Sequence, residues 1–286
     1  MKVDAHQHYW KISRDDYGWI TPDLPRLYRN FLEDDLLPDL HACQISKTIV
    51  VQAAPTIEET DFILSLSEQS ETIAGVVGWL DLDDPSYKKQ LERFQQHPKF
   101  VGIRVMIQDM EDETTILQQH YVDAFSYFEQ IDLPIDLLVT SNQLEAVCQL
   151  LKQTSIRAVI DHMAKPEIAQ GITEAWKQQM AEIAQYPNIY CKISGMVTEA
   201  DHQSWRQEDF IPYVHHIVDV FGPNRLMYGS DWPVCLLAAS YTDVHDICEA
   251  TLPTNLTTQQ RKNIFGQNAI DFYKVKLSSD GVPHPR

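Results

Sequence analysis

The apolar residues of this 286-residue chain are concentrated in short runs spread along its whole length. There are eight of these runs, and most are rich in Val, Ile and Leu without alternation with polar residues. That pattern is typical of parallel strands that are buried on both faces. We therefore predict eight buried strands, at residues 3–8, 48–53, 75–82, 100–106, 134–139, 157–162, 189–194 and 226–229.

The segments between these runs place apolar residues at helical spacing. The clearest case is 141–153, where Leu144, Val147, Cys148 and Leu151 share one helix face. We predict helices at 59–70, 85–94, 141–153, 173–185 and 209–221. Repeated strand–helix alternation predicts an α/β fold, a single (β/α)8 TIM barrel in one domain over 1–286, with a loose tail at 275–286. A doubly wound sheet is disfavoured because no Gly-rich phosphate turn follows an early strand.

The composition of the chain limits which binding partners and which cellular compartment we expect for the protein. The net charge of −18 argues against nucleic acid and against an anionic membrane surface, but not against a small anionic substrate. No apolar run approaches the ~20 residues that span a bilayer, and no signal peptide is evident. The five cysteines are scattered, which indicates reduced thiols. We expect a cytoplasmic protein without a membrane partner. The sequence does not decide between a monomer and a homo-oligomer.

A His-x-His pair lies on the first predicted strand. Side chains two residues apart on a strand point to the same face, so His6 and His8 can reach one small target, with Asp4 expected on that face one step deeper. Such a pair can bind a divalent metal such as zinc, or it can be structural. The last predicted strand runs into the segment GSDWP at 229–233, which places Asp231 at the tip of a tight turn.

The C-terminal mouth of a TIM barrel is where functional residues gather. Polar and aromatic residues at or near the predicted strand ends are Gln52, Trp79, Asp81, Arg104, Gln108, His162, Lys192 and Asp231. The long segment 9–30 follows the first strand and is rich in aromatic residues, so we expect it to shape a pocket at this mouth.

Taken together, these motifs resemble the amidohydrolase superfamily. They are the His6-x-His8 pair, the Asp161-His162 strand end, the 229–233 turn and the closing helix at 263–273. The likeness is to its sugar-lactone lactonase branch, the L-fuconolactonase and L-rhamnonolactonase type, which is related to 2-pyrone-4,6-dicarboxylate lactonase. The resemblance spans nearly the whole chain and implies a TIM barrel with its site at the C-terminal mouth.

The resemblance also implies a metal site and residue roles. His6, His8 and Asp231 match the ligands of one divalent ion, with zinc as the expected metal, and His162 matches a histidine that binds metal or polarises a carbonyl. A two-metal site is not expected, because the fifth strand carries no histidine and the fourth offers no bridging lysine. Some lactonases of this branch work without metal, so a site without metal is the alternative.

These parts suit a hydrolase that opens a small sugar-derived lactone by attack of water on the ester carbonyl. Asp231 would act as general base and then as general acid. His162 or Lys192 would hold the developing oxyanion. Arg104 suits a carboxylate or hydroxyl-rich substrate. The remaining candidates for substrate binding are Trp10, Trp79 and Gln52.

Structural alternatives stand beside several of these roles. Lys192 can instead pair with a barrel carboxylate such as Asp4, and Arg104 can form a structural ion pair. Trp10 and Trp79 can belong to the core. Two other functions also compete with the lactonase: a decarboxylase of the same superfamily acting on a small aromatic or unsaturated acid, and a barrel that binds without catalysis.

Overall fold

The computed structural model describes residues 1–276, and its sheet has eight parallel strands in sequence order. The tail predicted at 275–286 lies outside the described residues from 277 on. The strands are β1 (Lys2–Gln7), β2 (Ile45–Val51), β3 (Ile73–Gly78), β4 (Phe100–Met106), β5 (Ile135–Leu138), β6 (Ala158–Ile160), β7 (Ile189–Ile193) and β8 (Leu226–Tyr228). A parallel bridge between Gln7 and Trp232 joins the first strand to the end of the last, so the predicted (β/α)8 barrel is confirmed.

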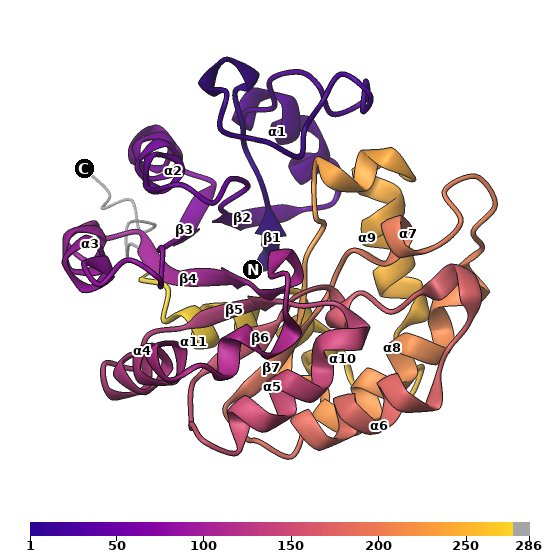
Figure 1. Cartoon of the computed structure of the whole chain (residues 1–286). Coiled ribbons are helices and arrows are strands. Elements are labelled where there is room, and N and C mark those ends of the chain that lie inside the picture. Colours follow the sequence, from indigo (N-terminus) through magenta and orange to yellow (C-terminus); the bar gives the residue numbers. More distant parts are fainter. Residues whose placement is uncertain (277–286) are drawn as a thin grey trace, which may run out of the picture.

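Helices surround the strands, as Figure 1 shows. They are α1 (Glu33–Ala42), α2 (Ile57–Gln69), α3 (Tyr87–Phe94), α4 (Gln119–Gln130), α5 (Leu144–Leu151), α6 (Glu174–Ile183), α7 (Met196–Glu199), α8 (Gln207–Phe221), α9 (Tyr241–Thr251), α10 (Thr258–Lys262) and α11 (Asn268–Tyr273). Each of the five predicted helices overlaps one of these, namely α2, α3, α5, α6 and α8. Helix α11 lies within the closing helix expected at 263–273. The others, including the 12-residue α4, lie in segments for which we predicted no helix.

A compact apolar cluster fills the lower part of the barrel. Val3, Ala5 and Ile49 pack there against Phe272 and Tyr273 of α11, the last described helix. The segment 263–273 is not one helix, because a π-helical turn at Asn263–Gln267 precedes α11. The chain therefore returns to the barrel at its end, and α11 closes the cluster beneath the strands.

The first strand departs from simple alternation. Its pairing with β2 shifts register between Asp4 and Gln7. Asp4 accepts hydrogen bonds from the backbone amide of Ser230 at 2.9 Å and from the Tyr241 hydroxyl of α9 at 3.0 Å. The expectation that Asp4 shares a face with His6 is therefore wrong, because the irregularity turns Asp4 toward the surrounding helices.

The segment after β1 folds back over the mouth, as expected. Trp10 and Phe31 exchange two backbone hydrogen bonds, of 2.9 and 3.0 Å. The Trp19 indole donates to the carbonyl of Ala53 at 2.8 Å, and the Tyr17 hydroxyl donates to Glu59 at 2.8 Å. These bonds fix the segment beside the ends of β1 and β2. Within residues 1–276, every helix is too short or too polar to cross a bilayer.

Candidate active site

His6 of β1 and His8, just after the strand, meet at the mouth of the barrel. The Nε2 atoms of His6 and His8 lie 3.2 Å apart, and both residues are buried. The Nδ1 atom of His8 lies 2.7 Å from the carbonyl oxygen of Val51. A carbonyl only accepts, so His8 carries its proton on Nδ1 and directs the lone pair of Nε2 toward His6.

Asp231 joins this pair from the end of β8. Its Oδ1 atom lies 3.4 Å from Nε2 of His8 and 3.8 Å from Nε2 of His6. Its backbone amide donates to the carbonyl of His6 at 2.8 Å, and its φ of 57° turns the chain sharply here. Burial opposes ionisation, but the imidazoles of His162, His8 and His6 outweigh it and hold the pKa of Asp231 below its ordinary value. Asp231 is therefore a carboxylate at neutral pH.

His162 approaches from the end of β6 through an unusual turn. Residues 162–165 all adopt positive φ, between 46° and 60°, which L-residues rarely do in sequence. The turn brings Nε2 of His162 to 3.8 Å from Oδ1 of Asp231, while Nδ1 lies 2.8 Å from the hydroxyl of Ser194. Burial lowers the pKa of His162 to about 4, so this imidazole is neutral at pH 7.

A glycine makes room for this imidazole. Gly195 has a φ of 65°, and a Cβ atom there would lie 2.8 Å from the ring of His162. A larger residue would therefore be strained by its backbone and would also displace the ring. Sequence reasoning identified neither Gly195 nor Ser194 as a support of His162.

Lys192 lies beneath the histidines and does not line the cavity. Its ammonium contacts Asp136 at 2.5 Å, Asp161 at 3.0 Å and Nδ1 of His6 at 3.1 Å, and the side chain is fully buried. Asp136 also accepts a hydrogen bond of 2.7 Å from the hydroxyl of Tyr273 in α11. The expectation that Lys192 holds an oxyanion is not supported, because carboxylates occupy its donors. A barrel carboxylate does pair with it, although not Asp4.

The pKa values of the two carboxylates beside Lys192 are shifted in opposite directions. Burial raises the pKa of Asp136 to about 6 despite the nearby ammonium. At Asp161 burial acts in the same direction, but Lys192 and His6 outweigh it and hold the pKa well below the usual range. Asp161 is thus a buried anion that lies 3.3 Å from Nδ1 of His6. Nδ1 of His6 thus lies between this anion and the Lys192 ammonium at 3.1 Å, and in the tautomer whose proton faces Asp161 the lone pair of Nε2 is free.

Arg104 extends from β4 to the cavity, and Gln52 fixes its guanidinium by hydrogen bonds. One of its terminal nitrogens donates to the side-chain oxygen of Gln52 at 3.0 Å and also to the backbone carbonyl of the same residue. The amide nitrogen of Gln52 in turn lies 3.0 Å from the sulfur of Met106. Gln52 is fully buried, so the structure places it as a support of Arg104 and not as a substrate contact.

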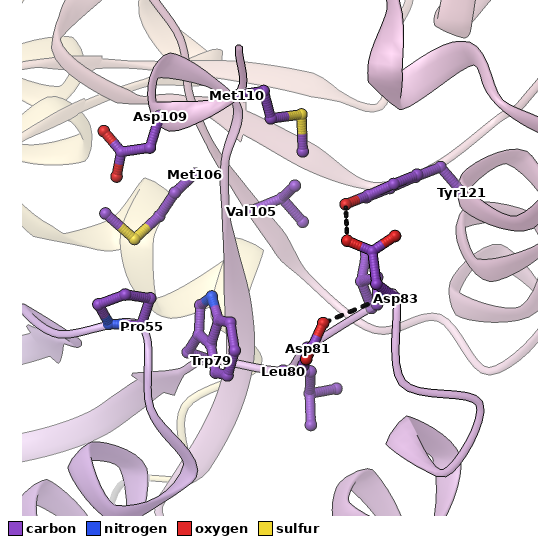
Figure 2. Close-up of a pocket in the computed structure, with 11 residues that line it drawn as sticks. Pro55, Trp79, Leu80, Asp81, Asp83, Val105, Met106, Asp109, Met110 and Tyr121 are labelled. Atoms are coloured by element: carbon purple, nitrogen blue, oxygen red, sulfur yellow. Dashed lines mark hydrogen bonds between the residues drawn. The ribbon is translucent and has the colours of Figure 1, made fainter. Parts of the chain in front are cut away.

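A cavity of about 200 Å³ opens above these residues. The residues named from the sequence that line it are His8, Arg104, Gln108, His162 and Asp231. Trp19, Asp109, Leu138 and Lys165 line it too, although none of them was assigned a role from the sequence. Trp10 is fully buried and donates to the carbonyl of Arg29 at 2.8 Å, so direct contact between Trp10 and a substrate is not supported. Trp79 lines a second hollow beside this cavity (Figure 2).

The geometry of His6, His8 and Asp231 fits a single divalent metal. Their facing atoms are separated by 3.2, 3.4 and 3.8 Å. Ligand atoms about 2.0–2.1 Å from a tetrahedral zinc ion lie about 3.3–3.4 Å from one another, which is close to these separations. Two imidazole nitrogens and one carboxylate oxygen are also the ligand types that zinc takes in proteins.

A second group of potential ligands consists of His6, Asp161 and His162. The Lys192 ammonium lies 3.0 Å from Asp161 and 3.1 Å from His6. The ammonium already places one positive charge at this group, and it would repel a metal ion there.

Comparisons with known proteins agree with the resemblance stated above. The chain is 38% identical over 284 residues to an L-fucono-1,5-lactonase of Burkholderia ambifaria, covering 98% of this chain and 97% of that protein. It is 34% identical over 296 residues to an L-fucono-1,5-lactonase of Burkholderia multivorans, covering 98% of each. A crystal structure of an amidohydrolase from Burkholderia multivorans with bound zinc superposes with a TM-score of 0.91 at 34% identity, covering 96% of this chain and all of the other. A family model described as amidohydrolase matches residues 3–275, and the chain therefore belongs to the amidohydrolase family.

Proposed function

We propose that this protein is a hydrolase that opens the ester bond of a small sugar lactone. The observation that carries the proposal is the position of Asp231, an ionised carboxylate on the cavity wall within 3.4–3.8 Å of three imidazoles. The similarity to L-fucono-1,5-lactonases over 97–98% of the lengths of the chains supports the substrate class.

Asp231 is proposed as the group that moves the proton. It takes a proton from the attacking water as the oxygen of that water bonds to the lactone carbonyl carbon. It returns the proton to the ring oxygen when the carbon–oxygen bond breaks, and a hydroxy acid is released. Because the pKa of Asp231 is low, this carboxylate is a weak base, so the water must be acidified by another group.

A divalent metal, which we propose to be zinc, would be held by His6, His8 and Asp231 and would supply that acidification by lowering the pKa of water to about 7. The zinc in the similar crystal structure supports this choice of metal. Asp161 contributes from below, since in the tautomer of His6 whose proton faces Asp161 the lone pair of Nε2 is directed at the same point.

His162 is proposed to stabilise the oxyanion. If the hydroxyl of Ser194 donates to Nδ1, the proton of the neutral imidazole lies on Nε2, which faces the cavity. From there it can donate to the carbonyl oxygen as negative charge develops. Arg104 and Lys165, the two cationic side chains on the cavity wall, suit the carboxylate that forms.

The decarboxylase alternative is less well supported. The strand-five histidine that such enzymes use on the metal is absent, and Leu138 at the end of β5 lines the cavity instead. No described feature favours the non-catalytic alternative over the lactonase.

A panel of aldono-1,4- and 1,5-lactones, followed with a pH indicator after subtraction of spontaneous opening, tests the proposal. Zinc-loaded protein should turn over at least one lactone, and Asp231→Asn should lower kcat by about 10²–10⁴-fold. Asp61→Asn, at an exposed ion pair with Arg93, is the matched control and should be unaffected. Failure of the metal-loaded protein to accelerate any lactone in the panel would refute the proposed function.

A further inference from the structure

A second hollow adjoins the candidate active site. The two have the same volume, about 200 Å³ each. Met106 and Asp109 line both, so the two spaces share part of their wall. A molecule in the cavity beside Asp231 would reach the neighbouring hollow past these two side chains, and a volume of about 200 Å³ suits one small ring.

An indole with a free donor forms part of the second hollow. Trp79 follows β3 and lies near Pro55, with Met106 and Asp81 also on the wall (Figure 2). The indole nitrogens of Trp10, Trp19, Trp176 and Trp205 each donate to a backbone carbonyl. Trp79 makes no such bond within residues 1–276. Its ring face and N–H group are therefore available to a ligand with both apolar C–H faces and polar acceptors.

The charges around this hollow restrict the ligand further. Asp81, Asp83 and Asp109 line it, and no lysine or arginine of the described chain does. Asp83 is held by His120 at 2.8 Å and by the Tyr121 hydroxyl at 3.1 Å. Asp81 and Asp109 each use one oxygen in a local hydrogen bond, of 3.0 and 3.2 Å. Their second oxygens can accept from hydroxyl groups, whereas an anion would be repelled.

We propose that this hollow binds a neutral sugar ring, and that the ring is the non-reacting half of a lactone built from two sugar units. Trp79 stacks on the C–H face of the ring, and the carboxylates of Asp81 and Asp109 accept from its hydroxyls. The lactone ring lies in the adjoining cavity, where Arg104 and Lys165 face the carboxylate that is formed. Assignment of the bound ring to a substrate rests on the proposed lactonase function, but the binding itself does not.

Saturation-transfer difference NMR with the methyl glycosides of glucose, galactose and fucose tests the binding. We expect at least one of them to bind in the millimolar range. Trp79→Ala should weaken that binding about tenfold, because it removes the stacking face and the donor. Trp79→Tyr should retain most of it, and Trp205→Ala, a half-buried indole in a different hollow, should retain all of it. Methyl glucuronide should not bind.

A kinetic comparison tests the link to the substrate. We expect a higher kcat/KM for cellobiono-1,5-lactone than for D-glucono-1,5-lactone, with the difference lost in Trp79→Ala. Absence of any glycoside binding, or binding that Trp79→Ala leaves unchanged, overturns the sugar site even if lactones are hydrolysed. Glycoside binding that depends on Trp79, in a protein that hydrolyses no lactone, overturns the assignment to a lactone substrate and the proposed function with it.

Discussion

The buried ammonium of Lys192 makes a stability prediction that can be worked through from the structure. Methionine at this position keeps the unbranched side chain but removes the charge that lies 2.5 Å from Asp136 and 3.0 Å from Asp161. Arg104, at 3.7 Å from Asp161, is then the nearest remaining cation to these carboxylates. Removal of one partner from a buried ion pair costs about 3–5 kcal/mol, so Lys192→Met should lower the free energy of unfolding by that amount at pH 7.

The same substitution should change how stability depends on pH. The pKa of Asp136 is about 6 when folded, above its ordinary value of 3.8, so its contribution to stability is fully present below pH 3.8 and is lost as pH rises toward 6. Without Lys192 the pKa rises further, and this loss continues above pH 6. The stability difference between wild type and variant should therefore grow by up to about 1.4 kcal/mol per pH unit from pH 6 to pH 8.

Urea unfolding followed by circular dichroism at pH 6, 7 and 8 measures both effects. EDTA in all samples removes any contribution from metal binding. Lys177→Met, at an exposed pair with Glu174, is the matched control and should cost at most about 0.5 kcal/mol. Adding Asp136→Asn to Lys192→Met should restore part of the lost stability. A Lys192→Met protein as stable as wild type, or destabilised equally at all three pH values, would refute the reasoning.

Three further predictions concern the mouth of the barrel. Zinc added to EDTA-treated protein should raise the free energy of unfolding by about 2.7 kcal/mol at a free zinc concentration of 100 times Kd. An unchanged Tm on addition of zinc, or an equal rise of Tm in His8→Gln, would contradict the metal site. His162 has a pKa of about 4 in the folded protein against 6.5 when unfolded, so the free energy of unfolding of wild type should fall by about 3 kcal/mol between pH 6.5 and pH 4. His162→Gln should lose less stability over this range, and a pH profile identical to that of wild type would refute the reasoning. Ser194→Ala removes the 2.8 Å contact that orients His162 and should lower kcat about five- to tenfold with little change in KM, whereas a kcat within about twofold of wild type would show that the contact is dispensable.

Buried apolar runs were enough to predict the barrel, because a parallel strand enclosed on both faces has little choice of composition. All eight predicted strands overlap observed strands. Helix α4 was missed because it begins with polar residues and has no side-chain cap that marks its start. Asp4 was misplaced because an irregularity of register leaves no sign in a short strand.

The candidate site was predictable where a residue lies at a strand end, as His8, His162 and Asp231 do. It was not predictable where burial depends on partners that are distant in sequence. For Lys192 the sequence left open a substrate contact or a pair with a barrel carboxylate such as Asp4. The carboxylates that enclose its ammonium are Asp136, 56 residues away, and Asp161. Trp19 lies in a segment without periodicity, so nothing in the sequence distinguished it from Trp10, which is fully buried.

The contact between Tyr273 and Asp136 has a consequence for the order in which the protein matures on the ribosome. His6 is synthesised long before Tyr273, whose hydroxyl helps to hold the Lys192–Asp136 pair from α11. A nascent chain that has not yet released residue 273 therefore lacks part of the support beneath His6. Full organisation of the active centre must await the emergence of α11 from the ribosome.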